Sequence, residues 1–228
     1  MARQRGDDLS VNEKRIWDFL MEKIGNPCGV AGLMGNLYAE SGLNPINLQN
    51  SYERKLGMTD EAYTKAVDSG KYKANSFIHD SAGYGLAQWT YHARKEKLLD
   101  FARKRKASIG DLDMQLEFLW KELQGYKGVL KALCEAKSVR KASDAVLTQY
   151  ERPRNQGEAV KIKRASFGQR YFDQFANQTD EENEEEGEDM VNTEAENAWD
   201  VPEDMVFVLD AKGNPVRLEV ADDADDQA

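Results

Sequence analysis

Three glycines spaced at intervals of three constrain this chain more than any other feature of its sequence. Gly29, Gly32 and Gly35 lie among apolar residues with helical spacing in the stretch 27–41, which predicts a helix with one bare face. Each glycine inside a helix costs roughly 1 kcal/mol relative to alanine. Such a helix is tolerated only if another element packs tightly against the bare face. We therefore expect residues 27–41 to form the buried central helix of the domain.

Helical patterns continue on both sides of this segment. Ser10 and Glu13 form a capping box in front of an amphipathic run that ends at Gly25. No long strand pattern appears before residue 200, so the predicted fold class is mainly α. The remaining helices that the periodicity predicts lie at 59–67, 92–106, 111–124, 127–136, 139–151 and 156–176, with an irregular loop at 71–81.

The formal net charge of -10 is divided unevenly along the chain. Residues 178–228 hold 19 acidic and two basic side chains, whereas the residues before them hold 29 basic and 22 acidic ones. The run 179–189 is nearly all Glu and Asp, which repel one another and cannot bury a core. We expect a basic domain at 8–177, an acidic disordered linker at 178–200 and a separate final segment at 201–228.

The final segment contains two runs with strand-like composition. Residues 205–209 and 216–220 flank a turn sequence that includes Gly213 and Asn214, which predicts a β-hairpin followed by an acidic tail. A lone hairpin is marginal in water, so it needs a partner surface.

Several classes of protein are not expected from this sequence. No apolar run approaches the ~18–20 residues of a membrane span, and the charged first ten residues do not resemble a secretory signal peptide. His79 and His92 show no ligand spacing with Cys28 or Cys134, so no metal and no cofactor are expected.

Glu40 is the first candidate for chemistry, because it falls in the last turn of the glycine-rich helix. The negative end of the helix dipole and partial burial both disfavour an ionised carboxylate there. A carboxyl that keeps its proton near neutral pH is suited to general acid catalysis. The alternative interpretation is a helix-terminal glutamate in a salt bridge with a neighbouring Lys or Arg.

The second candidate segment is GYGLAQWT, at residues 83–90. Its two glycines allow close backbone approach, and Gln88, Trp89 and Thr90 follow directly. An exposed tryptophan beside an amide is a typical surface for a sugar ring, because the indole is flat and apolar while the amide pairs with polar groups. A tryptophan packed in the core is the alternative.

Taken together, these two segments resemble the phage tail lysozyme family, a branch of the lysozyme-like fold that cleaves bacterial peptidoglycan. The specific part of the resemblance is the combination of VAGLMGNL and AESG within residues 30–42 with GYGLAQWT at 83–90. The resemblance covers about three quarters of the chain, from residue 12 to residue 176. Weaker matches are Ile16-Trp17, Asn44-Pro45, Arg94, Tyr150-Glu151-Arg152-Pro153 and the helix from Arg164 to Tyr171.

The resemblance implies a lysozyme-like helical domain with a catalytic cleft. The resemblance further implies that Glu40 protonates the glycosidic oxygen between N-acetylmuramic acid and N-acetylglucosamine. The run Gln88–Thr90 would face Glu40 across the cleft. Tyr84 either stacks on a sugar or packs in the core. Asn36, one turn before Glu40, either holds the carboxylate or caps a buried backbone group.

A second carboxylate is needed for the usual glycosidase chemistry, at a separation that depends on the stereochemical outcome. Asp80 is the first choice because it leads directly into the cleft segment, although an Asp that caps a turn is the alternative. Without a second carboxylate, the substrate's acetamido group or 6-hydroxyl would attack and give transglycosylase-type products. The carboxylates available between Glu40 and Trp89 are Glu53, Asp60, Glu61, Asp68 and Asp80.

Basic residues cluster between Arg94 and Lys106. No base-reading motif accompanies them, so no nucleic-acid partner is expected. Attraction to an anionic cell wall is one interpretation, and a solvated helix face is the other.

The functional expectation is a peptidoglycan hydrolase of the muramidase type, a virion-associated or phage-encoded lysin. We expect it either in the virion or in the host cytoplasm before release, and acting on the bacterial cell wall. Its partners would be bacterial peptidoglycan and, through the C-terminal tail, phage tail proteins. The alternatives are a non-catalytic wall-binding or tail structural protein, a lytic transglycosylase, and an N-acetylglucosaminidase on the same fold.

Overall fold

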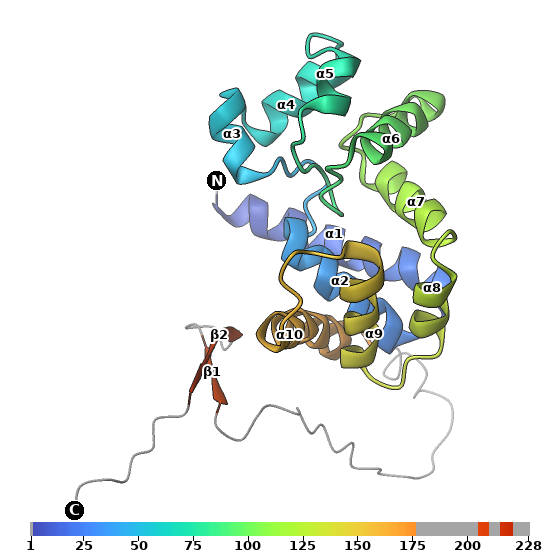
Figure 1. Ribbon diagram of the computed structural model, residues 1–228, viewed down its shortest axis with the longest axis vertical. Helices are drawn as coiled ribbons and strands as arrows, with labels where there is room; N and C mark the ends of the chain where they lie inside the picture. Colours follow the sequence, from blue (N-terminus) through green and yellow to red (C-terminus); the bar gives the residue numbers. More distant parts are fainter. Residues whose placement is uncertain (1, 177–204, 210–214, 221–228) are drawn as a thin grey trace, which may run out of the picture.

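The structure is a computed structural model that describes residues 2–176, 205–209 and 215–220, with side chains described from residue 11 to residue 176. Within these ranges the domain is built from helices, which confirms the mainly α fold class (Figure 1). The helices are α1 (Ala2–Ile24), α2 (Pro27–Ser41), α3 (Asn50–Leu56), α4 (Asp60–Asp68), α5 (Ala74–His79), α6 (His92–Arg105), α7 (Leu112–Leu123), α8 (Lys127–Cys134), α9 (Val139–Val146), a π-helix (Leu147–Glu151) and α10 (Glu158–Phe175).

Helix α2 is the buried central helix that the glycine spacing predicts. It packs against α1, α8, α9 and α10, while α3, α4 and α5 lie together at the other end of the domain (Figure 1). A Cβ atom on Gly29 would overlap the backbone of Leu133 in α8, and one on Gly35 would overlap the backbone of Arg164 in α10. On Gly32 it would lie 2.5 Å from the Cβ of Ala142 in α9. Because these glycines carry no side chain, the backbones of α8, α9 and α10 approach the backbone of α2 closely.

Both ends of α2 are fixed by capping residues. The Asn26 side chain accepts a hydrogen bond from the Gly29 backbone N–H at 3.1 Å, and its amide donates to the carbonyl of Cys134 at 3.0 Å. At the other end Gly42 adopts the left-handed conformation, with φ +63°, and its N–H donates to the carbonyl of Tyr38. These caps place Glu40 in the last turn of the helix.

The helices differ from the sequence predictions in four respects. Helix α1 begins at Ala2, so Ser10 lies inside the helix and does not start it. The loop expected at 71–81 contains α5, and α3 was not predicted at all, since helices of six or seven residues show too little periodicity to be recognised. The run 139–151 also changes its winding after Val146 and continues as a π-helix.

The C-terminal hairpin is confirmed at the level of the backbone. Strand β1 (Met205–Leu209) pairs antiparallel with β2 (Pro215–Val220), with Met205 opposite Val220 and an irregularity at Val208 and Leu209. The predicted linker at 178–200 and the acidic end of the chain lie outside the described residues.

The segment 83–90 forms a tight loop held at both ends. Tyr84 makes isolated antiparallel bridges with Leu48 and with Trp89. Nearby, the Ser41 hydroxyl donates to the carbonyl of Leu86 at 2.9 Å. The loop is thereby tied directly to the end of α2. Among the described residues, no helix has both the length and the apolarity needed to cross a membrane.

We predict that Gly35→Ala destabilises the domain by roughly 1–3 kcal/mol, the usual cost of overpacking, even though alanine is the better helix former. The added methyl would overlap the backbone of Arg164 and Gly168, which cannot rotate away. The control is Gly128→Ala in α8, where the methyl would meet only the end of the Gln149 side chain. Thermal or urea unfolding would measure both variants, and a Gly35→Ala protein as stable as wild type would contradict the packing argument.

Candidate active site

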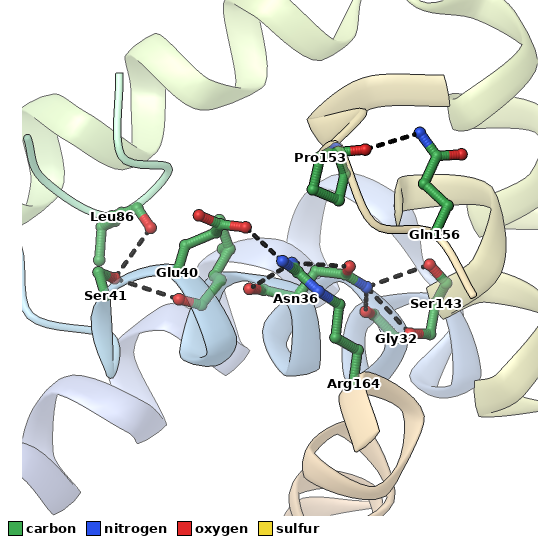
Figure 2. Close-up of polar contacts among 10 residues, drawn as sticks. Gly32, Asn36, Glu40, Ser41, Leu86, Ser143, Pro153, Gln156 and Arg164 are labelled. Carbon is green, nitrogen blue, oxygen red and sulfur yellow. Dashed lines mark hydrogen bonds and ion pairs between the residues drawn. The ribbon is translucent and has the colours of Figure 1, made fainter. Parts of the chain in front are cut away.

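Glu40 lies in an ion pair at the end of α2. Arg164 in α10 donates from Nη2 to Oε1 of Glu40 at 2.5 Å (Figure 2). The salt-bridge interpretation of Glu40 is therefore confirmed. The Glu40 side chain keeps 22% of its surface exposed, whereas the Arg164 side chain keeps 10%. Glu40 is thus held from within the protein and still reaches solvent.

Asn36 is fully buried and contacts the Arg164 member of this ion pair. Its amide nitrogen donates to the carbonyl of Gly32 at 2.9 Å and to the carbonyl and hydroxyl of Ser143 at 3.1 and 3.0 Å (Figure 2). Its amide oxygen accepts a hydrogen bond from Nη1 of Arg164 at 3.3 Å. Of the two interpretations, Asn36 satisfies buried backbone groups and reaches Glu40 only through Arg164. Since it is fully buried, it does not present a surface to a substrate.

Glu151, the last residue of the π-helix, is the second carboxyl of this cluster. Its side chain is half-buried, but Oε1 is out of contact with solvent and has no hydrogen-bond partner among the described residues. Burial is the main cause that raises the pKa of Glu151 to about 8, and the negative charge of Glu40 raises it further. The positive charges of Arg94 and Arg164 act in the opposite direction. The balance of these effects favours the protonated form of Glu151 near neutral pH.

Glu151 lies outside the segment between Glu40 and Trp89 in which the second carboxylate was predicted, and it was therefore missed. The available signal was the run Tyr150-Glu151-Arg152-Pro153, which matched the family weakly and received no function. An α-helix continued through residue 151 would have turned this side chain in another direction. After Val146 the chain instead winds as a π-helix, and Arg152 then adopts the left-handed conformation with φ +49°. This backbone sets the direction of the Glu151 side chain.

Trp89 is fully buried, so the prediction of an exposed sugar platform at this residue was wrong. Its indole N–H donates to Oε2 of Glu122 at 2.7 Å, and its ring packs edge-on against Phe118 at 5.3 Å between centroids. Arg94 binds both oxygens of Glu122 at 2.9 Å and donates to the hydroxyl of Tyr150 at 2.7 Å. A buried tryptophan needs a partner for its N–H, and this internal network supplies it.

The other predicted binding residues divide by exposure. Tyr84 is fully buried and its hydroxyl lies 2.7 Å from that of Thr64, so it packs rather than presents a stacking face. Gln88 is half-buried and donates from Nε2 to Oδ1 of Asn47 at 2.8 Å. Thr90 is exposed and donates to the carbonyl of Gln88 at 2.9 Å. Thr90 and part of Gln88 are the groups of this loop that face solvent.

Asp80 serves the structure of the loop, and the capping interpretation replaces its assignment as second carboxylate. Lys95, fully buried, donates to Oδ1 of Asp80 at 2.5 Å, and the Tyr63 hydroxyl donates to Oδ2 at 2.5 Å. The backbone N–H of Ala82 also donates to Oδ1, at 2.9 Å. Burial lowers the pKa of Lys95, while the bond to Asp80 opposes that shift. With 6% of its side chain exposed, Asp80 has its oxygens occupied by internal donors.

Comparison with known proteins agrees with the helical architecture. Residues 11–175 match the model of a family described as phage tail lysozyme. Morphogenesis protein 1 of Bacillus phage B103 is 24% identical over 171 residues, which cover 70% of this chain and 39% of that protein. The chain thus spans about two fifths of the length of this relative.

The raised pKa of Glu151 predicts a specific pH dependence of stability. Between about pH 4.5 and 8 the unfolded chain releases this proton while the folded chain keeps it, so wild-type stability falls as the pH rises. Glu151→Gln stays neutral and lacks this loss. We expect the variant to match wild type near pH 4 and to be more stable by roughly 2–4 kcal/mol near pH 8.5, at ~1.4 kcal/mol per pKa unit. Urea unfolding at the two pH values measures this, and a constant difference would contradict it.

Proposed function

The chain belongs to the phage tail lysozyme family, and on this premise we propose that it is a peptidoglycan hydrolase with Glu40 as its general acid. The bond cleaved would be the β-1,4 bond between N-acetylmuramic acid and N-acetylglucosamine. The observation that carries the proposal is the position of Glu40. Its carboxyl reaches solvent at the junction of α2 and the 83–90 loop, beside a second carboxyl in a largely buried cluster.

In this mechanism Glu40 gives its proton to the glycosidic oxygen. The bond from C1 to that oxygen breaks with its electron pair on the oxygen, which leaves as the alcohol of the next sugar. Water then adds its hydroxyl to C1, and its remaining proton returns to the carboxylate. This step requires that Glu40 carry a proton when substrate is bound, and in the free protein its carboxyl lies in contact with the Arg164 guanidinium.

The basic surface of α6 supports an anionic partner such as the cell wall. Arg94 and Lys95 do not belong to this surface, because they bind Glu122 and Asp80 inside the domain. The exposed members are Lys97 and residues 103–106. A row of cations at the end of a helix also complements the helix dipole, so the same residues have a structural benefit. In the proposed function they bring the enzyme, carried by the virion or released on lysis, to the wall.

A non-catalytic wall-binding or tail structural protein is the second candidate. The ion pair between Glu40 and Arg164 at 2.5 Å favours it, because the pair neutralises Glu40 within the protein. The burial of Trp89 removes the most obvious sugar platform and points the same way. Such a protein would bind sacculi and release no fragments from them.

The test of the proposed function is Glu40→Gln, which keeps the shape of the side chain and removes its proton chemistry. We expect the rate of fragment release from purified sacculi to fall at least 100-fold, in line with the usual contribution of a general acid. Glu135→Gln, an exposed glutamate in α8's C-terminal cap, is the matched control and should keep the wild-type rate.

Two outcomes would contradict the proposal. If Glu40→Gln releases fragments as fast as wild type, Glu40 is not the acid. If wild type binds sacculi in a pull-down and releases nothing, the non-catalytic candidate is correct.

A further inference from the structure

Tyr91 and two histidines form an exposed row of rings at the start of α6. Among the Phe, Tyr and Trp residues between residues 11 and 176, Tyr91 alone is exposed, with 61% of its surface in contact with solvent. Its ring centroid lies 4.3 Å from that of His92, and the His92 ring stacks on the ring of His79 at 5.7 Å between centroids, with 27° between the planes. Both histidines are exposed. Single exposed apolar side chains are normal, whereas three flat rings in contact form a continuous surface.

We propose that this ring row, formed by Tyr91, His92 and His79, binds the glycan strand of peptidoglycan, with a sugar unit stacked on the ring of Tyr91. The inference rests on the proposed function and deepens it, because it assigns a second surface that holds the same substrate. It also supplies the exposed aromatic ring that Trp89, which is fully buried, does not provide.

The chemistry of the ring row matches that of a sugar. A pyranose ring has an apolar face of C–H groups and a rim of hydroxyl and acetamido groups. A tyrosine offers a flat apolar ring with a polar tip. The exposed Thr90 lies directly before Tyr91, and its hydroxyl donates to the carbonyl of Gln88 at 2.9 Å. A hydroxyl that donates can still accept a hydrogen bond, so Thr90 can pair with the polar rim of a bound sugar.

The backbone on both sides of Tyr91 is fixed by buried polar contacts. Before it, the Trp89 indole donates to Oε2 of Glu122 at 2.7 Å. After it, the backbone N–H groups of Arg94 and Lys95 donate to the Tyr91 carbonyl at 2.9 and 3.0 Å. The side chain of Arg94 binds Glu122 as well. A ring on a fixed backbone loses little conformational freedom when a ligand binds, which favours binding.

The histidines are brought together by a buried ion pair. His79 is the last residue of α5 and His92 the first residue of α6. Asp80 follows His79 directly, and its Oδ1 accepts a hydrogen bond from Nζ of Lys95 in the first turn of α6 at 2.5 Å. Lys95 is fully buried and the Asp80 side chain keeps 6% of its surface exposed. The contact between the ends of these helices therefore holds the two imidazole rings in their stack.

The ring row lies on the same loop that contacts the end of α2. The hydroxyl of Ser41, the residue after Glu40, donates to the carbonyl of Leu86 at 2.9 Å. Tyr91 follows Leu86 by five residues, which span at most about 18 Å when fully extended. A glycan strand of several sugars that lies at Glu40 is therefore long enough to reach Tyr91.

The experiment measures binding in the Glu40→Gln background, which keeps the strand intact under the proposed function. The probe is peptide-free glycan strands from purified sacculi, titrated calorimetrically. We expect Tyr91→Ala to weaken binding roughly fivefold to tenfold, because it removes the stacking ring, and Tyr91→Trp to stay within about twofold. The matched control is Val11→Ala, since Val11 is an apolar residue of α1 with 56% of its surface exposed. It should bind as the parent does.

A second readout locates the strand on the ring itself. Tetranitromethane nitrates exposed tyrosine rings, and mass spectrometry identifies the modified residue. Saturating glycan strands should slow nitration of Tyr91 at least fivefold and leave the half-buried Tyr52 in α3 unaffected.

Two results would overturn the inference: equal affinity of Tyr91→Ala and its parent for the strands, or nitration of Tyr91 at the same rate with and without them. Failure of the proposed function has a different signature. If wild type releases no fragments from sacculi but Tyr91→Ala still weakens binding, catalysis fails and glycan binding at the ring row stands.

Discussion

The site depends on the close contact between the glycine face of α2 and the backbones of three other helices. The contact at Gly35 fixes the backbone of Arg164, whose side chain reaches Glu40 one turn further along α2. The contact at Gly32 fixes Ala142 and Ser143, and Ser143 binds the amide of Asn36. Side chains at these glycine positions would hold the helices apart. The positions of the side chains around Glu40 therefore depend on the three glycines of α2, which carry no Cβ atom.

The electrostatics of the cluster follow from the same packing. Two carboxyls, Glu40 and Glu151, lie in a largely buried region with the guanidinium groups of Arg94 and Arg164 nearby. Arg94 is already bound to both oxygens of Glu122, so its charge is largely balanced by that partner. Arg164 is similarly engaged with Glu40. Burial and the charge of Glu40 therefore raise the pKa of Glu151 to about 8, although the charges of Arg94 and Arg164 act in the opposite direction.

The parts of the fold that depend on neighbouring residues could be predicted from the sequence. The glycine spacing predicted the central helix and its burial correctly, because the spacing is a pattern within one helix. Glu40 in the last turn followed from it. Its ion pair with Arg164 was one of two interpretations, since a partner 124 residues away leaves no mark on the local pattern.

The parts that failed depend on distant contacts. Trp89 is buried with its N–H bonded to Glu122, and the Asp80 carboxylate is paired with the buried Lys95. Glu151 depends on a change from α- to π-helical winding, which the periodicity at 139–151 does not reveal. In each case the residue type was visible in the sequence and its surroundings were not.

The most direct measurement of the central claim is mass spectrometry of the fragments that wild type releases from purified sacculi. The account predicts muropeptides that end in a reducing N-acetylmuramic acid, as hydrolysis at Glu40 requires. Fragments with a 1,6-anhydro end, or with N-acetylglucosamine at the reducing end, would contradict the proposed reaction, and sacculi that release no fragments would contradict catalysis altogether.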